Sequence, residues 1–333
     1  MRILITGGKG VIGSCVARRM LKKGDEIVIF DPMPDTALIN DFIDDVVVVG
    51  GDVLDLPLLL NTIKQHKVQK ILHLAALIVP ASQINPYRGF QVNALGTVNV
   101  LEAARITDCE RMVFTSTKGV YAEITGKHAH PTYAPIDEDY PKDPVNVYSS
   151  TKLACEHMCF NYTRNYGTDI VILRFSSLYG PGRLLRHGGL AIHSAILENA
   201  MLGKPTIISS GGDQQEDMTY IDDVARSIAL AANVKNLKQH VFNVGTGRGV
   251  TLNDTAEIVQ RLYPNAEIRI GPGLDCFRVG YNLYSVMDIS RAKAELGYEP
   301  AFDLEAGIED HVATLNRLGI EPRYTNVEKL MAG

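Results

Sequence analysis

The stretch TGGKGVIGS, from Thr6 to Ser14, decides the fold because it joins a strand pattern to a helix pattern through closely spaced glycines. The apolar run Ile3-Leu4-Ile5 directly before it makes Met1 to Ile5 a predicted buried strand, and the periodic residues from Val11 to Leu21 predict an amphipathic helix. Glycines let a backbone approach a pyrophosphate closely, and the N-terminus of the next helix directs free N–H groups at the phosphate. The stretch therefore predicts a phosphate-binding turn.

An acidic residue at the end of the second strand indicates which dinucleotide this turn binds. Residues Glu26 to Phe30 predict a strand, and Asp31 follows it, 18 residues after Gly13. A carboxylate there accepts hydrogen bonds from the adenosine ribose hydroxyls and repels a 2′-phosphate. The sequence therefore favours NAD over NADP.

Strand and helix patterns alternate along the first half of the chain. The expected strands are 2–6, 26–30, 45–49, 70–75, 111–116 and 169–175, and the expected helices between them are 11–22, 57–65, 89–106 and 147–166. Such alternation predicts an α/β fold with a doubly wound parallel sheet of the Rossmann type, and ligands at the carboxyl ends of the strands.

The pattern loosens after residue 175 and predicts a smaller C-terminal substrate-binding region. We expect residues 1–175, joined by 217–245, to form the NAD-binding domain, and 176–216 with 246–333 to bind substrate. Further expected elements are helices at 190–202, 222–233 and 252–262, a strand at 240–244, and loops at 118–146 and around Pro181, Gly182, Gly188 and Gly189.

Composition excludes several classes of protein. The net charge of −5 gives no support to binding of nucleic acid or of an anionic membrane, and no apolar run is long enough to span a bilayer. The 5 cysteines are irregularly spaced, which favours free thiols in a reducing cytoplasm. His128 and His130 form an H-x-H pair without further ligands nearby, so we expect surface histidines and no metal site.

Four residues suggest proton transfer at the carboxyl end of the sheet. Tyr148 and Lys152 are four residues apart in a predicted helix and therefore share one face. A nearby ammonium favours the phenolate and so lowers the pKa of a tyrosine. Ser116 and Thr117 end a predicted strand, where a hydroxyl can share a substrate oxygen with Tyr148. Combined with the phosphate-binding turn, these residues predict proton-coupled hydride transfer to NAD.

In this order along the chain, these motifs resemble the extended short-chain dehydrogenase/reductases, in particular the NAD-dependent epimerase/dehydratase group with its nucleotide-sugar 4-epimerases. The matching segments are T-G-x-x-G-x-x-G (Gly7, Gly10, Val11, Ile12, Gly13), Asp31, GDVLD (Asp52, Val53), HLAA (Leu74, Ala75, Ala76), VNALGTVNVLEAAR (Asn93), the triad Thr117, Tyr148 and Lys152, and LYGPG, MTYIDDVA and FNVGTG.

The resemblance implies a role for each matching residue. It implies that the glycine turn, Asp31, Asp52, Val53, Leu74, Ala75 and Ala76 bind NAD, with Asn93 supporting the site. It also implies that Tyr148 is the acid or base, that Lys152 holds the nicotinamide ribose, and that Thr117 orients the substrate hydroxyl. A cytoplasmic homodimer joined by helices near 89–106 and 147–166 is implied as well.

The chain departs from the family pattern at several positions. Lys118 and Gly119 stand where dehydratases carry Asp-Glu, so dehydration is not expected. Ser177 replaces an asparagine of sugar epimerases, and Glu216 replaces a diphosphate-binding arginine, whose ligand a carboxylate would repel. Arg278 stands where a second such arginine is expected.

The substrate loop adds Arg183, Arg186 and His187, either as further positive charge for the substrate or as a solvated basic loop. We expect Ser116, Thr117, Ser177, Arg183 and Arg278 to bind substrate. The resulting hypothesis is an NAD-dependent epimerase-type oxidoreductase acting on a sugar, with a nucleotide sugar favoured. The alternatives are an NAD-dependent dehydrogenase of a smaller polyol, sugar acid or hydroxy acid, which Glu216 and Ser177 favour, and a non-catalytic NAD-sensing protein.

Overall fold

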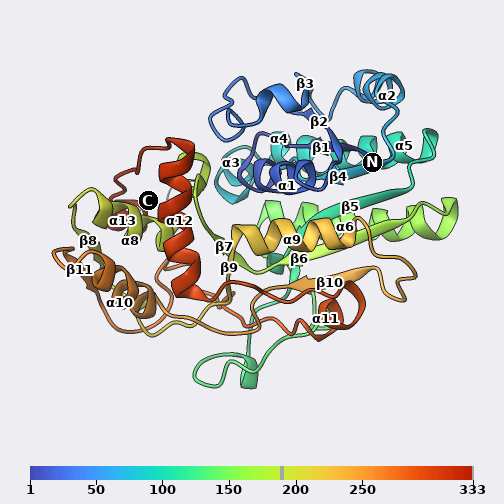
Figure 1. Ribbon diagram of the computed structural model, residues 1–333. Coiled ribbons are helices and arrows are strands. Elements are labelled where there is room, and N and C mark those ends of the chain that lie inside the picture. Colours follow the sequence, from blue (N-terminus) through green and yellow to red (C-terminus); the bar gives the residue numbers. More distant parts are fainter. Residues whose placement is uncertain (188–190, 332–333) are drawn as a thin grey trace.

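A computed structural model describes residues 1–187 and 191–331 of the chain and has a parallel sheet at its centre (Figure 1). Within these residues the sheet contains seven strands in the order β10-β6-β5-β4-β1-β2-β3. The strands are β1 Arg2–Thr6, β2 Glu26–Phe30, β3 Val47–Val49, β4 Lys70–His73, β5 Arg111–Thr117, β6 Ile170–Phe175 and β10 Val241–Val244. Every pairing in the sheet is parallel, which confirms the doubly wound α/β fold.

Helices cover both faces of this sheet. Successive residues of a strand point to opposite faces, and the strand residues on both faces are apolar. Ile3 and Ile5 of β1 pack with α1 (Val11–Leu21), α9 (Ile221–Ala231) and α11 (Ser290–Leu296). Leu4 points to the other face and packs with α2 (Leu56–Gln65), α5 (Gly96–Ile106) and α6 (Val147–Tyr166). The strands therefore have almost continuously apolar sequences because the sheet is buried between two layers of helices.

The helix expected at 89–106 is divided in the structure. Short helices α3 (Val79–Ile84) and α4 (Pro86–Phe90) lead into a π-helical turn, Gln91–Leu95, and then into α5. Asn85 caps α4 by accepting the N–H of Arg88. The extra residue of a π turn rotates the following side chains, and such turns commonly lie at functional sites.

The remaining elements form a smaller region beside the carboxyl end of the sheet (Figure 1). Its helices are α7 Arg183–His187, α8 Ile192–Met201, α10 Leu252–Leu262, α12 Leu304–Leu318 and α13 Val327–Met331. Its strands are β7 Ser177–Tyr179, β8 Thr206–Ile208, β9 Met218–Tyr220 and β11 Ile268–Ile270, paired as β7–β9 and β8–β11. Gly188 and Gly189 of the expected loop, and the first residue of the expected helix 190–202, lie outside the described residues.

Two segments pack into the core of the sheet domain although the sequence pattern did not indicate this: the segment around 287–298 and the loop 118–146. Met287, Ile289 and Tyr298, which we assigned to the substrate-binding region, are buried against the core of the sheet domain. The long loop 118–146 contains 3-10 turns at Lys118–Val120 and Gly126–His128, and it buries Tyr121 and Ile136 in the same core. No helix in the described parts of the chain combines the length and apolarity needed to cross a membrane.

Candidate active site

The glycine turn between β1 and α1 is packed too closely to hold side chains. Gly7 has a φ of 72°, and a Cβ on it would lie 2.8 Å from the backbone nitrogen of Ala75. A Cβ on Gly13 would lie 2.2 Å from the carbonyl oxygen of Gly7. The turn is therefore held against the segment that follows β4, with its backbone exposed to the cavity above it.

One cavity of about 660 Å³ lies at the carboxyl end of the sheet and brings most of the predicted site residues together. Its lining includes Gly7, Gly10, Val11, Ile12, Gly13, Asp31, Asp52, Val53, Leu74, Ala75, Ala76, Ser116, Thr117, Tyr148, Lys152, Ser177 and Arg183. Residues from both the sheet domain and the smaller region line it. This is the crevice in which parallel α/β folds bind their ligands.

Asp31 is fixed at one end of the cavity by backbone donors. Its Oδ2 accepts the N–H of Lys9 at 3.0 Å, and its Oδ1 accepts the N–H of Met33 at 2.9 Å. The side chain of Lys9, which the sequence did not single out, donates to the carbonyl of Met33 at 2.5 Å. A buried carboxylate between two backbone donors suits the hydroxyls of an adenosine ribose, so the residues here fit NAD.

Two predicted residues do not line the cavity. Asn93 lies in the π turn, exchanges hydrogen bonds with the backbone of Leu77, and donates to Thr151 Oγ1 at 3.2 Å. It therefore positions the segment after β4 against α6. Arg278 points elsewhere and donates to Ser209 Oγ at 2.6 Å.

The hydroxyls at the end of β5 have different partners. Thr117 Oγ1 accepts the N–H of Gly119 at 3.1 Å, so its own proton is free for another acceptor. Ser116 donates to Glu156 Oε1 at 2.5 Å, and Glu156 is also paired with Arg174 in the protein interior. Thr117 is thus available to a substrate, whereas Ser116 is tied to a buried ion pair.

Helix α6 carries Tyr148 and Lys152 into the cavity. Asn146 caps the helix by accepting the N–H of Ser149 at 2.9 Å. Lys152 Nζ donates to the carbonyl of Thr115 at 2.7 Å and lies 5.8 Å from the centroid of the Tyr148 ring. Burial lowers the pKa of Lys152 to about 8.

The ionisation of Tyr148 differs from the sequence-based expectation. Burial raises the pKa of its phenol to about 12, and the cation that opposes this rise is Arg183 rather than Lys152. Lys152 is turned toward the backbone of β5, which explains its small influence on the phenol. The sequence could not show this, because Arg183 lies 35 residues further along the chain.

Comparison with known proteins shows to which family this arrangement of site residues belongs. The profile of the NAD-dependent epimerase/dehydratase family matches residues 3–245, which is more than half of the chain. The chain belongs to this family. A UDP-glucose 4-epimerase of Mycolicibacterium smegmatis is 30% identical over 313 residues, covering 92% of this chain and 96% of the relative.

Solved structures agree with the family assignment. The UDP-glucose 4-epimerase of Thermotoga maritima, solved with UDP-glucose, superposes with a TM-score of 0.84 at 27% identity, covering 95% of this chain and 99% of that one. The enzyme of Thermus thermophilus, solved with NAD, gives a TM-score of 0.79 at 29% identity, with coverage of 95% and 99%. This member of the epimerase/dehydratase family is an NAD-dependent enzyme of the extended short-chain dehydrogenase/reductase type.

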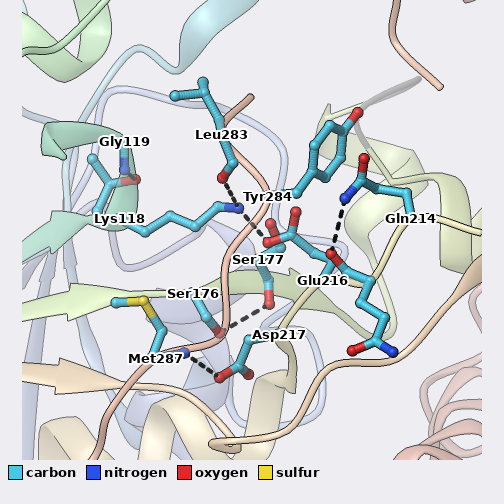
Figure 2. Close-up of polar contacts among 12 residues, drawn as sticks. Lys118, Gly119, Ser176, Ser177, Gln214, Glu216, Asp217, Leu283, Tyr284 and Met287 are labelled. Atoms are coloured by element: carbon cyan, nitrogen blue, oxygen red, sulfur yellow. Dashed lines mark hydrogen bonds and ion pairs between the residues drawn. The ribbon is translucent and has the colours of Figure 1, made fainter. Parts of the chain in front are cut away.

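The departures of this epimerase/dehydratase member from the family pattern meet in space. Lys118 forms an ion pair with Glu216, although the two residues are 98 positions apart, and donates to the carbonyl of Leu283 at 2.9 Å (Figure 2). Ser177 lies beside this pair (Figure 2) and lowers the pKa of the same carboxylate. Burial raises the pKa of Glu216, and Lys118 opposes that rise. Glu216 is therefore held as half of a neutral pair at the cavity wall.

Proposed function

We propose that this enzyme epimerises a nucleotide sugar by inverting one hydroxyl of the sugar ring. The observation that carries the proposal is that Thr117, Tyr148 and Lys152 line the same cavity as the glycine turn and Asp31. Relatives described as UDP-glucose 4-epimerases, and a solved complex with UDP-glucose, support this class of substrate.

Each residue of the site has a chemical task in this reaction. Tyr148 accepts the proton of the sugar hydroxyl as the phenolate, the form that the charge of Arg183 favours against burial. It returns the proton after the ketone has turned over in the cavity. Thr117, whose hydroxyl proton is free, donates to the same substrate oxygen. Lys152 donates one N–H to the carbonyl of Thr115, and its remaining N–H groups can donate to the nicotinamide ribose. The glycine turn and Asp31 would hold NAD in this cavity, where it would supply the reversible hydride acceptor that the inversion needs.

We further propose that the enzyme is a cytoplasmic homodimer. Large apolar side chains are exposed on α3, α4 and the π turn, among them Ile84, Tyr87, Phe90 and Leu95. These elements pack beside α6, which itself exposes Tyr166 at its last residue. Contiguous exposed apolar area commonly marks a protein interface. The 5 free cysteines support a reducing compartment.

The test incubates the purified protein with UDP-glucose and a catalytic amount of NAD, and follows the sugar by NMR. We expect interconversion with the 4-epimer and no accumulation of NADH. Tyr148→Phe should lower turnover by about 10²- to 10⁴-fold, because the variant lacks the acid/base hydroxyl. The same variant should bind NAD with unchanged affinity in calorimetry.

Two results would contradict the proposal. Stoichiometric NADH formation, with a panel of polyols and sugar acids as substrates, would assign a dehydrogenase. NAD binding without turnover of any nucleotide sugar or polyol would assign a non-catalytic NAD-binding protein.

A further inference from the structure

The family pattern implies a phosphate-binding arginine at one position on the cavity wall, and among residues 1–187 and 191–331 the cation beside that position is already paired. Glu216 occupies that position, and its side chain and that of Lys118 are only 11% and 13% exposed. Lys118 is also engaged by the carbonyl of Leu283 (Figure 2). Because both charges of the pair are compensated, this wall does not attract an anion.

Positive charge lies instead on α7, which lines the same cavity. Arg183 and Arg186 are three residues apart on this helix and therefore share a face. The Nε of Arg183 and the Nε and Nη2 of Arg186 are buried and have no hydrogen-bond partner among residues 1–187 and 191–331. Buried N–H groups without a partner are costly, so these three donors indicate an external acceptor.

The surroundings of α7 show where such an acceptor lies. Arg183 lies close enough to Tyr148 for its charge to lower the pKa of the phenol. Arg186, whose side chain is 10% exposed, pairs through Nη1 with Asp35 at 2.9 Å, four residues after Asp31. Both arginines therefore line the cavity, Arg183 within electrostatic reach of the reacting tyrosine and Arg186 beside the segment that follows Asp31.

The charged groups around α7 give this helix a net positive charge. His187 Nδ1 pairs with Arg183 Nη1 at 2.6 Å, and burial together with both arginines lowers the pKa of His187 to about 3. The histidine is therefore a neutral acceptor at physiological pH. Asp35, which is 45% exposed, is the carboxylate paired with this helix.

We propose that Arg183 and Arg186 form a diphosphate-binding clamp on α7, which does the work of the arginine that Glu216 replaces. Guanidinium forks match the oxygens of a diphosphate, and two forks on one helix face can engage both phosphates. This inference rests on the proposed function where the ligand is a nucleotide sugar. The pyrophosphate of NAD offers the same chemistry, and the experiment separates the two sources.

The experiment measures two affinities by calorimetry: that of NAD for the protein alone, and that of UDP for the NAD-saturated protein. The variants are Arg183→Met and Arg186→Met, with Arg183→Lys to retain the charge without the fork. Arg269→Met is the matched control, because Arg269 is 74% exposed and pairs with Glu267 away from this cavity. Thermal melting without ligand checks that each variant is folded.

We expect each methionine variant to weaken UDP binding by about ten- to a hundredfold, the range for removal of one charge-assisted hydrogen bond, with NAD affinity unchanged. Arg183→Lys should fall between wild type and Arg183→Met. A weaker NAD affinity instead would assign the clamp to the cofactor pyrophosphate. Unchanged affinity for both ligands overturns the clamp, even if UDP binds the wild type. Failure of UDP to bind wild type argues against the nucleotide-sugar function, and the NAD measurements then decide the clamp.

Discussion

At the residue scale, the adenosine end of the cavity combines two opposite charges. The carboxylate of Asp31 is held by the backbone of Lys9 and Met33, while the ammonium of Lys9 donates to the carbonyl of Met33. The carboxylate is fixed at the cavity and repels a 2′-phosphate. The lysine would attract the same phosphate if the carboxylate were removed.

Replacing Asp31 with alanine should therefore relax the choice of cofactor. Wild-type protein should bind NAD much more tightly than NADP, and Asp31→Ala should narrow that ratio by at least about tenfold, because one charge repulsion is removed. Adding Lys9→Met to the variant should abolish the increase in NADP affinity. Titrations followed by intrinsic fluorescence or calorimetry measure the affinity of each protein for NAD and for NADP. Equal affinities for the two cofactors in the wild type would contradict this role of Asp31.

Lys152 should make NAD binding depend on pH. Burial lowers its pKa to about 8, and the protonated ammonium is the better donor to a ribose hydroxyl. Binding therefore favours the protonated form and raises the pKa. The affinity is fully present below pH 8 and falls as the pH rises through that value. Calorimetry between pH 6.5 and 9.5 should show this decline in wild type and a flat profile in Lys152→Met. Parallel declines in both proteins would assign the pH dependence to another group.

At the scale of elements, long periodic segments were predictable from the sequence and short ones were not. The strand β1, the helix α1 and the helix α6 lie within one residue of their predicted bounds. Glycines separate β1 from α1, and α6 begins after the capping residue Asn146 and ends at Gly167 in the left-handed conformation. The predicted helix 89–106 is instead divided at the π turn, since periodicity does not record an inserted residue. Strands β7 and β9 have three residues each, too few to carry a pattern, and tertiary pairing alone defines them.

The turn between β1 and α1 should tolerate no added methyl group. Gly13→Ala would place its Cβ against the carbonyl of Gly7, so we expect about 1–3 kcal/mol of destabilisation and a large decrease in NAD affinity. Gly50→Ala is the matched control, because no atom lies within 4 Å of the added Cβ. Thermal melting and NAD titration of the two variants test this. An alanine at position 13 that melts and binds as wild type would show that the turn can open.

At the scale of the whole molecule, the topology brings together residues that no local pattern connects. Lys118 follows β5 of the central sheet and Glu216 precedes β9 of the separate β7–β9 pair, and the folded chain places the two side by side near Ser177. The sequence predicted which residues after the strands would meet in one cavity, because these follow the strands in a fixed order, and their role in binding NAD stays a prediction. It did not predict that the departures at Lys118, Ser177 and Glu216 would compensate one another, because a pairing across 98 residues depends on the folded chain.

The proposed dimer also belongs to this scale, since the neighbouring elements α3, α4 and the π turn all expose large apolar side chains. Ile84 is 85% exposed and Tyr87 is 75% exposed, and Phe90 lies on the same short helix as Tyr87. In a dimer these side chains would leave water, at about 25 cal/mol for each Å² buried. Charges placed there would remain buried without partners, so the variant Tyr87→Asp/Phe90→Asp should be a folded monomer. Light scattering after size exclusion should give half the mass of the wild type, with an unchanged far-UV spectrum. Tyr324→Asp, at an exposed position outside this area, should remain a dimer. A monomeric wild type at micromolar concentration, or a variant that stays dimeric, would assign this apolar area to another partner or to none.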